Sequence, residues 1–115
     1  MRIPIACTLT VDDAGTRLDE WRATLTRVVE AIERPAPTEL VFRLRADARS
    51  ELAPLVDLVQ REATCCAFFE FTLHIAVDGV TLRATVPPDA ASILDEFADL
   101  GRGRVVENAP PTGLC

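Results

Sequence analysis

The sequence predicts a single α+β domain, in which a four-stranded sheet carries three helices on one face in the order β-α-β-α-β-β-α. Apolar and polar residues alternate in four segments, as in half-buried strands, and apolar residues recur at three- and four-residue steps in three others, as in amphipathic helices. Strands and helices with one apolar side each pack together as two layers. The 115 residues suffice for one core. We assign residues 1–101 to the domain and residues 102–115 to a flexible C-terminal tail.

The first half of the chain contains two predicted strands around one long helix. Residues 3–9 alternate, and the face of this strand that points to the core carries Ile3, Ile5, Cys7 and Leu9. Asp12-Asp13 then begins a helix whose apolar positions continue to Ile32. Two prolines in residues 34–37 are expected to end this helix in a stiff connection. Residues 38–45 alternate again and form the second strand.

The second half is predicted to contain a helix, a hairpin and a last helix. The second helix ends at the adjacent pair Cys65-Cys66, and strands over 69–77 and 80–86 follow, joined by a two-residue turn at Asp78-Gly79. The last helix closes at Gly101. The inward face of the first of these strands carries Phe69, Phe71, Leu73, Ile75 and Val77. The outer sheet face carries Glu70, Thr72, His74, Thr81, Arg83 and Thr85. This polar face is expected to be solvated or to form a homodimer.

Charge and composition exclude several classes of partner. The formal net charge is −6 and the sequence pI is near 4.7, which argues against binding to nucleic acid or to an anionic membrane surface. The apolar part of the N-terminus is too short for a signal peptide, and no apolar run approaches the roughly 20 residues of a membrane helix. We therefore expect a cytoplasmic protein. In a reducing compartment, its four cysteines are more often metal ligands, reactive thiols or buried hydrophobes than disulfides.

The stretch from Arg61 to Phe71 is the predicted functional centre, because two adjacent thiols lie there between a helix and a strand. Helical spacing places Cys66 near the apolar side of the second helix and turns Cys65 away by about 100°. Cys7, on the core-facing side of the first strand, is the natural third ligand. Adjacent cysteines do not have the spacing of structural zinc knuckles. Two or three thiolates suit the soft ions Hg(II), Cu(I) and As(III).

Three functions follow from this interpretation. The first is the binding of a soft metal or metalloid ion, foremost Hg(II), by Cys65, Cys66 and Cys7, for resistance, buffering or delivery. The second is a cysteine-dependent lyase or reductase in which Glu62 donates a proton, although the pattern assigns no catalytic residue with certainty. The third is a protein-interaction domain whose cysteines are buried in the core. His74 is expected to be a solvated strand residue, and Cys115 either a fourth ligand or an incidental terminal residue.

Two motifs carry a resemblance to a known group of proteins. Ala6-Cys7-Thr8-Leu9 and the segment from Glu62 to Phe71 resemble small bacterial proteins, frequent in actinobacteria, that share an Ala-Cys-Thr-Leu strand and a Glu-x-x-Cys-Cys-x-Phe-Phe-x-Phe motif. Similar modules are attached to some MerR-type regulators, a family associated with sensing soft metals and thiol-reactive agents. The resemblance covers about residues 3–100 and implies that the three cysteines act together. The resemblance does not extend to DNA binding, because the chain has no helix-turn-helix. The chain also departs from the motif at Ala67, where a proline is common in the group.

Overall fold

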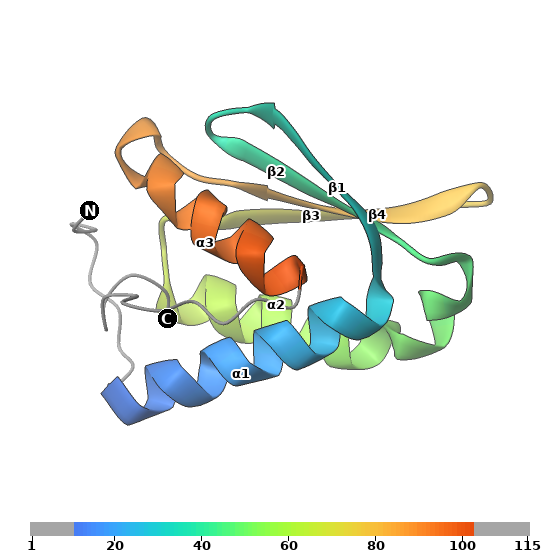
Figure 1. Ribbon diagram of the computed structural model, residues 1–115, viewed down its shortest axis with the longest axis horizontal. Helices are drawn as coiled ribbons and strands as arrows, with labels where there is room; N and C mark the ends of the chain where they lie inside the picture. The colour runs from blue at the N-terminus through green and yellow to red at the C-terminus, as the bar shows by residue number, and fades with distance from the viewer. Residues whose placement is uncertain (1–10, 103–115) are drawn as a thin grey trace.

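The computed structural model describes residues 11–102, apart from the side chains of residues 11–15 and of Cys65. It confirms the predicted fold class: one α+β domain with a four-stranded antiparallel sheet and three helices. In chain order the elements are α1 (Val11–Val28), β1 (Val29–Ala36), β2 (Glu39–Leu44), α2 (Leu52–Cys65), β3 (Glu70–Ala76), β4 (Gly79–Thr85) and α3 (Ala91–Gly101). Short 3-10 turns, Ala46–Glu51 and Pro88–Ala90, precede α2 and α3. The sheet order is β1-β2-β4-β3, and Figure 1 shows the three helices together on one side of it.

The first helix is shorter than the sequence predicts. It ends at Val28 instead of reaching Ile32, and the chain continues directly into β1, which pairs with β2 so that Ile32 lies opposite Phe42. Ile32 packs on the core from β1, so its apolar side chain fits the spacing of a helix and also the inner face of a strand. Pro35 disfavours a helix in this segment and is tolerated here, because β1 is an edge strand of the described sheet.

Two predicted segments lie outside the described residues. These are the strand over residues 3–9 and, apart from Arg102, the C-terminal tail over 102–115. Among the described residues, β1 supplies the strand that completes the four-stranded sheet.

The hairpin of β3 and β4 turns one residue earlier than predicted. Ala76 pairs with Gly79, so the two turn residues are Val77 and Asp78 instead of Asp78 and Gly79. Ile75 is 55% exposed and Val77 fully exposed, although the alternation had placed both in the core. Figure 1 shows that the tip of this hairpin projects past α1, α2 and α3.

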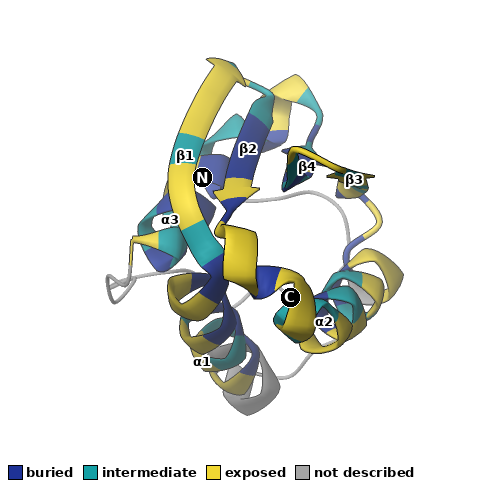
Figure 2. Ribbon diagram, turned by 90° about the vertical axis from the view of Figure 1, so that its right-hand side faces the viewer, coloured by how far each residue is buried: buried dark blue, intermediate teal, exposed yellow. Residues whose placement is uncertain are grey.

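The core lies between the inner sheet face and the helices. Its largest side chains are Trp21, Phe42 and Phe97, and the rings of Trp21 and Phe97 meet edge to face with centroids 4.7 Å apart. Such a contact adds about 0.5–1.5 kcal/mol to the burial itself. Figure 2 shows that β2 is largely buried, whereas β1 beside it is mostly exposed.

The outer face of the sheet is polar, as the sequence predicts. Exposed pairs cross between its strands, with Arg83 Nη1 2.9 Å from Glu39 Oε1 and Arg43 Nη1 3.6 Å from Glu33 Oε2. His74 is exposed on this face. Surface pairs of this kind each stabilise a fold by less than about 1 kcal/mol. Val41, in the central strand β2, is the exception because neighbouring side chains cover it.

Candidate thiol site

The junction between α2 and β3 holds the cysteine pair where the sequence places it. Cys65 is the last residue of α2, and the backbone N–H of Cys66 donates the closing hydrogen bond, 2.8 Å, to the carbonyl oxygen of Glu62. Cys66 itself is extended, with φ −124° and ψ 90°. Its carbonyl oxygen accepts a bond of 3.1 Å from the Phe69 N–H, which closes the turn into β3. The helix thus ends at Cys66 without a glycine.

Cys66 is completely buried and disulfide-bonded. The burial confirms its predicted place on the apolar side of α2. The disulfide differs from the free thiol that the sequence predicts for this position. The chain has four cysteines, so the partner of Cys66 is Cys7, Cys65 or Cys115, whose side chains lie outside the described part of the chain. A second sulfur therefore meets Cys66 at a buried position.

Aromatic rings line the core side of this junction. Phe68 and Phe69 are both buried and their ring centroids lie 4.9 Å apart, while Phe69 and Phe71 stack at 5.0 Å. Phe69 also contacts Phe97 of α3, at 5.5 Å. Phe68, which does not fit the strand alternation, is thereby part of the core. Cys66, Phe68 and Phe69 all belong to one buried core cluster.

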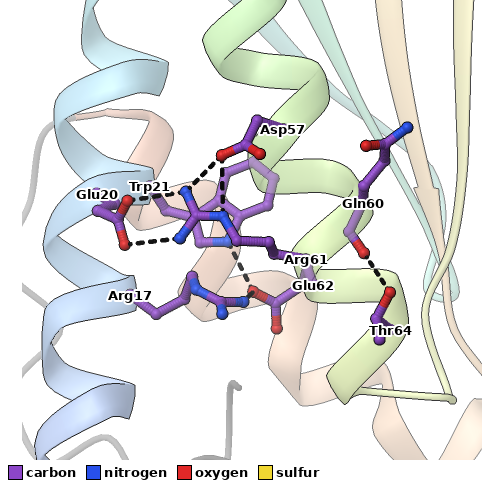
Figure 3. Close-up of polar contacts among 8 residues, drawn as sticks. All are labelled: Arg17, Glu20, Trp21, Asp57, Gln60, Arg61, Glu62 and Thr64. Carbon is purple, nitrogen blue, oxygen red and sulfur yellow. Dashed lines mark hydrogen bonds and ion pairs between the residues drawn. The ribbon is translucent and has the colours of Figure 1, made fainter.

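Glu62 lies one helical turn before Cys66 and is also completely buried. Its Oε1 accepts a hydrogen bond of 2.7 Å from the indole Nε1 of Trp21 and lies 3.4 Å from Nη1 of Arg17 (Figure 3). Both partners come from α1. A carboxylate can be buried here because a cation and a hydrogen-bond donor compensate for the lost hydration.

Sequence reasoning found Glu62 but missed these partners. Arg17 and Trp21 are both buried beside this carboxylate. The available signal was their spacing of four residues, which places both side chains on one face of α1. A glutamate on the apolar side of one helix requires buried donors on the neighbouring helix.

A second, more exposed cluster holds the same two helices together. Arg61 donates to both carboxylate oxygens of Glu20, at 3.2 and 2.9 Å, and to Asp57 at 2.9 Å (Figure 3). The hydrogen bond from Arg61 lowers the pKa of Glu20 below its ordinary value of 4.5. The same bond raises the pKa of Arg61. At the opposite end of the helices, Arg27 Nε lies 3.4 Å from Glu51 Oε1. The antiparallel register of α1 on α2 is therefore fixed at both ends.

The described residues contain one of the three predicted metal ligands. Cys66 is placed, whereas Cys7 and the Cys65 side chain lie outside the description. No group of three or more His, Cys, Asp or Glu residues that could hold a metal occurs between residues 11 and 102. His74 lies on the outer sheet face and takes no part in this junction. An open, shallow pocket of about 440 Å³ lies beside the junction, lined by Ala67, Phe68, Phe69, Glu70, Thr85, Val86 and Pro87.

None of the helices in the described range is long and apolar enough to cross a membrane. Comparisons with protein-family models, curated proteins and solved structures find no match to this chain.

Proposed function

We propose that this domain is a cytoplasmic thiolate module that binds a soft, thiophilic metal or metalloid ion, foremost Hg(II), through Cys66 together with Cys7 and Cys65. Resistance, buffering or delivery of the ion would be its role. One observation carries the proposal: the sulfur of Cys66 is bonded to a second cysteine sulfur at a fully buried position. Reduction of that disulfide leaves two thiols within reach of one ion, and soft ions prefer such ligands.

Burial also favours particular ions. A buried site that carries net charge is costly, because the charge loses its hydration. Two thiolates on Hg(II), or three on As(III), give a neutral complex, whereas two thiolates on Cu(I) leave one negative charge. The nearest buried carboxylate, Glu62, already contacts Arg17 and Trp21, so it is a poor additional ligand. These considerations rank Hg(II) first and As(III) second.

The test is native mass spectrometry of the phosphine-reduced protein titrated with Hg(II), As(III), Cu(I) and Zn(II). The reductant is removed before the titration, because a phosphine or a dithiol would compete with the protein for these soft ions. We expect a one-to-one Hg(II) adduct that Cys66→Ser weakens by orders of magnitude without loss of the fold. Single Cys7→Ser and Cys65→Ser variants distinguish two sulfur ligands from three. A Cys66→Ser protein that binds Hg(II) as tightly as the wild type would refute the proposal.

The disulfide also favours a second candidate, a thiol reductase. Because Cys66 is buried, its partner would attack the substrate disulfide and Cys66 would resolve the mixed disulfide. The lyase version is weaker, since Oε1 of Glu62 is already engaged by the Trp21 N–H and by Arg17. Turnover of a small aromatic disulfide by protein that forms no metal adduct would favour the reductase. Thiols that resist labelling until the protein unfolds would favour the interaction domain.

A further inference from the structure

The two edges of the described sheet, β1 and β3, differ in how well they are protected from pairing with another chain (Figure 2). β1 contains Pro35, and its register with β2 is interrupted twice. Proline and bulges of this kind hinder the addition of a further strand. β3 contains no proline and pairs with β4 without interruption from Glu70 to Ala76. Within residues 11–102 no strand pairs with its other side, so β3 is the open edge of the described sheet.

The hydrogen-bonding groups on this open edge come from alternate residues of β3. Ala76 and Gly79 flank a two-residue turn and therefore form a hydrogen-bonded pair. Hydrogen-bonded and non-hydrogen-bonded pairs alternate along an antiparallel ladder. The backbone N–H and C=O groups of Phe71, Leu73 and Ile75 thus point away from β4. A further strand at this edge would pair with these groups.

The apolar side chains along the same edge are less buried than their neighbours in β4. Phe71 and Leu73 are only partly buried and Ile75 is 55% exposed, whereas the β4 residues opposite all three are buried. A strand added beside β3 would therefore remove apolar surface from water on the inner side of the sheet, in addition to pairing the backbone.

The sequence of β3 is complementary to a second copy of itself. In an antiparallel pair related by a two-fold axis, inner residues must lie opposite inner residues, so the axis passes through one residue of β3. With the axis at Thr72, Thr72 lies opposite Thr72 of the partner subunit, and Glu70 lies opposite His74 of the partner subunit. All three side chains are exposed on the outer face. An imidazole donates a hydrogen bond to a carboxylate and forms an ion pair with it when protonated, and the symmetry produces this pair twice.

The neighbouring registers lack this complementarity. An axis at Leu73 places Glu70 opposite Ala76, which has no polar side chain. An axis at His74 places Glu70 opposite Asp78, and like charges at opposed positions destabilise a strand pair. On the outer face farther from this edge, the two arginines already form ion pairs within the chain. The charges therefore favour the β3 edge over the outer face as the contact surface.

We propose that two copies of this chain form a dimer in which β3 pairs antiparallel with β3 of the partner subunit, about a two-fold axis at Thr72. The two sheets then form one continuous sheet. In this register Ile75 lies opposite Phe69 of the partner subunit, and the hairpin tip with Val77 extends toward the turn between α2 and β3 of the partner subunit. This accounts for the exposure of Ile75 and Val77 in a single copy. The dimer is independent of the proposed function.

Sedimentation of full-length protein tests the dimer, in the presence of a reductant so that disulfides between subunits do not contribute. We expect a dimer fraction that rises with protein concentration up to about 100 µM. His74→Glu places a carboxylate opposite Glu70 at both symmetric positions and should weaken the dimer at least about tenfold. Addition of Glu70→Lys to His74→Glu restores opposite charges and should restore the dimer.

The control for this series is Glu30→Lys, on the other edge strand, which changes the net charge by the same amount as Glu70→Lys. It should leave the dimer unchanged. A protein that stays monomeric at every concentration would overturn the proposal. A dimer that His74→Glu does not weaken, or that the double variant does not restore, would also overturn it.

Cross-linking tests the register. Thr72→Cys places two thiols at the axis in a non-hydrogen-bonded pair, whose Cα atoms lie about 4.5 Å apart, within the usual range for a disulfide. His74→Cys is the matched variant, because four residues, about 13 Å, separate it from its own copy along the strand pair. Oxidation with glutathione disulfide should cross-link Thr72→Cys more than the wild type on a non-reducing gel, and His74→Cys no more than the wild type. Cross-linking of His74→Cys instead would overturn the register. If neither variant exceeds the wild type, the edge assignment fails even for a protein that is dimeric.

Discussion

Replacement of Glu62 tests whether a buried ionic cluster holds α1 and α2 together behind the thiol site. Glu62→Ala removes the acceptor of the Trp21 indole N–H and the countercharge of Arg17 in one step. Glu62→Gln removes the charge but retains an oxygen that can accept from Trp21. The two variants therefore separate the contribution of the ion pair from that of the hydrogen bond.

The expected magnitudes follow from burial and geometry. Removal of one partner of a buried ion pair costs about 3–5 kcal/mol, and an orphaned buried N–H costs about 1–3 kcal/mol, but the two losses overlap. The Arg17 side chain is 9% exposed and its 3.4 Å contact is long, so we expect the lower end, about 3–4 kcal/mol, for Glu62→Ala. Glu62→Gln also removes the countercharge of Arg17 but keeps an acceptor for the Trp21 N–H, so it should cost about 1–3 kcal/mol less than Glu62→Ala.

The assay is equilibrium urea unfolding of phosphine-reduced protein, so that the disulfide does not contribute to the differences. Glu51→Ala is the matched control: it breaks an ion pair of the same 3.4 Å length between α1 and the 3-10 turn that precedes α2, but both side chains are more than 40% exposed. That control should cost less than about 1 kcal/mol. If Glu62→Ala costs no more than Glu51→Ala, the cluster contributes nothing beyond a surface pair and the reasoning is wrong.

Three further predictions rest on other described residues. Burial raises the pKa of Glu96 above its ordinary value of 4.5, and the charges of Asp95 and Asp99 raise it further. The folded state then keeps this proton to higher pH than the unfolded state, so stability should fall as pH rises above 4.5 through the folded pKa. Glu96→Gln should remove that part of the slope in urea unfolding from about pH 4 to about pH 7, and an unchanged slope would contradict this account. Gly101→Ala places a Cβ 2.7 Å from Cε1 of the buried Phe42 ring and 3.1 Å from Cδ1 of Ile32. The steric strain should outweigh the gain in helix propensity and lower the free energy of unfolding by about 1–2 kcal/mol, measured by thermal unfolding. A variant more stable than the wild type would show that the Phe42 ring moves aside without cost. Arg61→Met should cost less than about 1 kcal/mol, because the Arg61–Glu20 pair is roughly 40% exposed, and most of that loss should vanish in high salt.

Periodicity predicted the class of the fold because each helix and strand has one apolar side. It misplaced the boundary at Val28 because Val29 and Ile32 lie at helical steps from the preceding apolar residues and also on the inward side of β1. The pattern of apolar side chains alone does not distinguish a longer helix from a helix followed by a strand. The backbone restriction imposed by Pro35 would have been the better guide. Likewise, alternation continued to Val77 although the helices end short of it, since a strand pattern contains no information about what covers it.

The candidate site was predictable to a similar extent. The burial of Cys66 followed from its place on the apolar side of α2, and the helix–strand junction followed from the change of period. The Arg17–Glu62–Trp21 cluster depends on contacts between residues at least 40 positions apart. Local sequence patterns do not encode the relative register of two helices, so these contacts could not be predicted from the sequence.

The charge balance of the Glu62 cluster links the stability of the fold to the proposed choice of ion. Glu62 and Arg17 carry opposite charges, so the region one turn from Cys66 is close to neutral and favours a neutral complex. Glu62→Gln removes one negative charge beside the buried Arg17 cation. At about 6 Å and an effective dielectric of about 20, one unit charge contributes about 2–3 kcal/mol. The variant should therefore bind Cu(I) more tightly relative to Hg(II), because the Cu(I) dithiolate is the anionic complex. Competition between the two ions, measured by native mass spectrometry in both proteins, would reveal this shift. An identical Hg(II)-to-Cu(I) preference would show that the electrostatic field of the cluster does not reach the thiols.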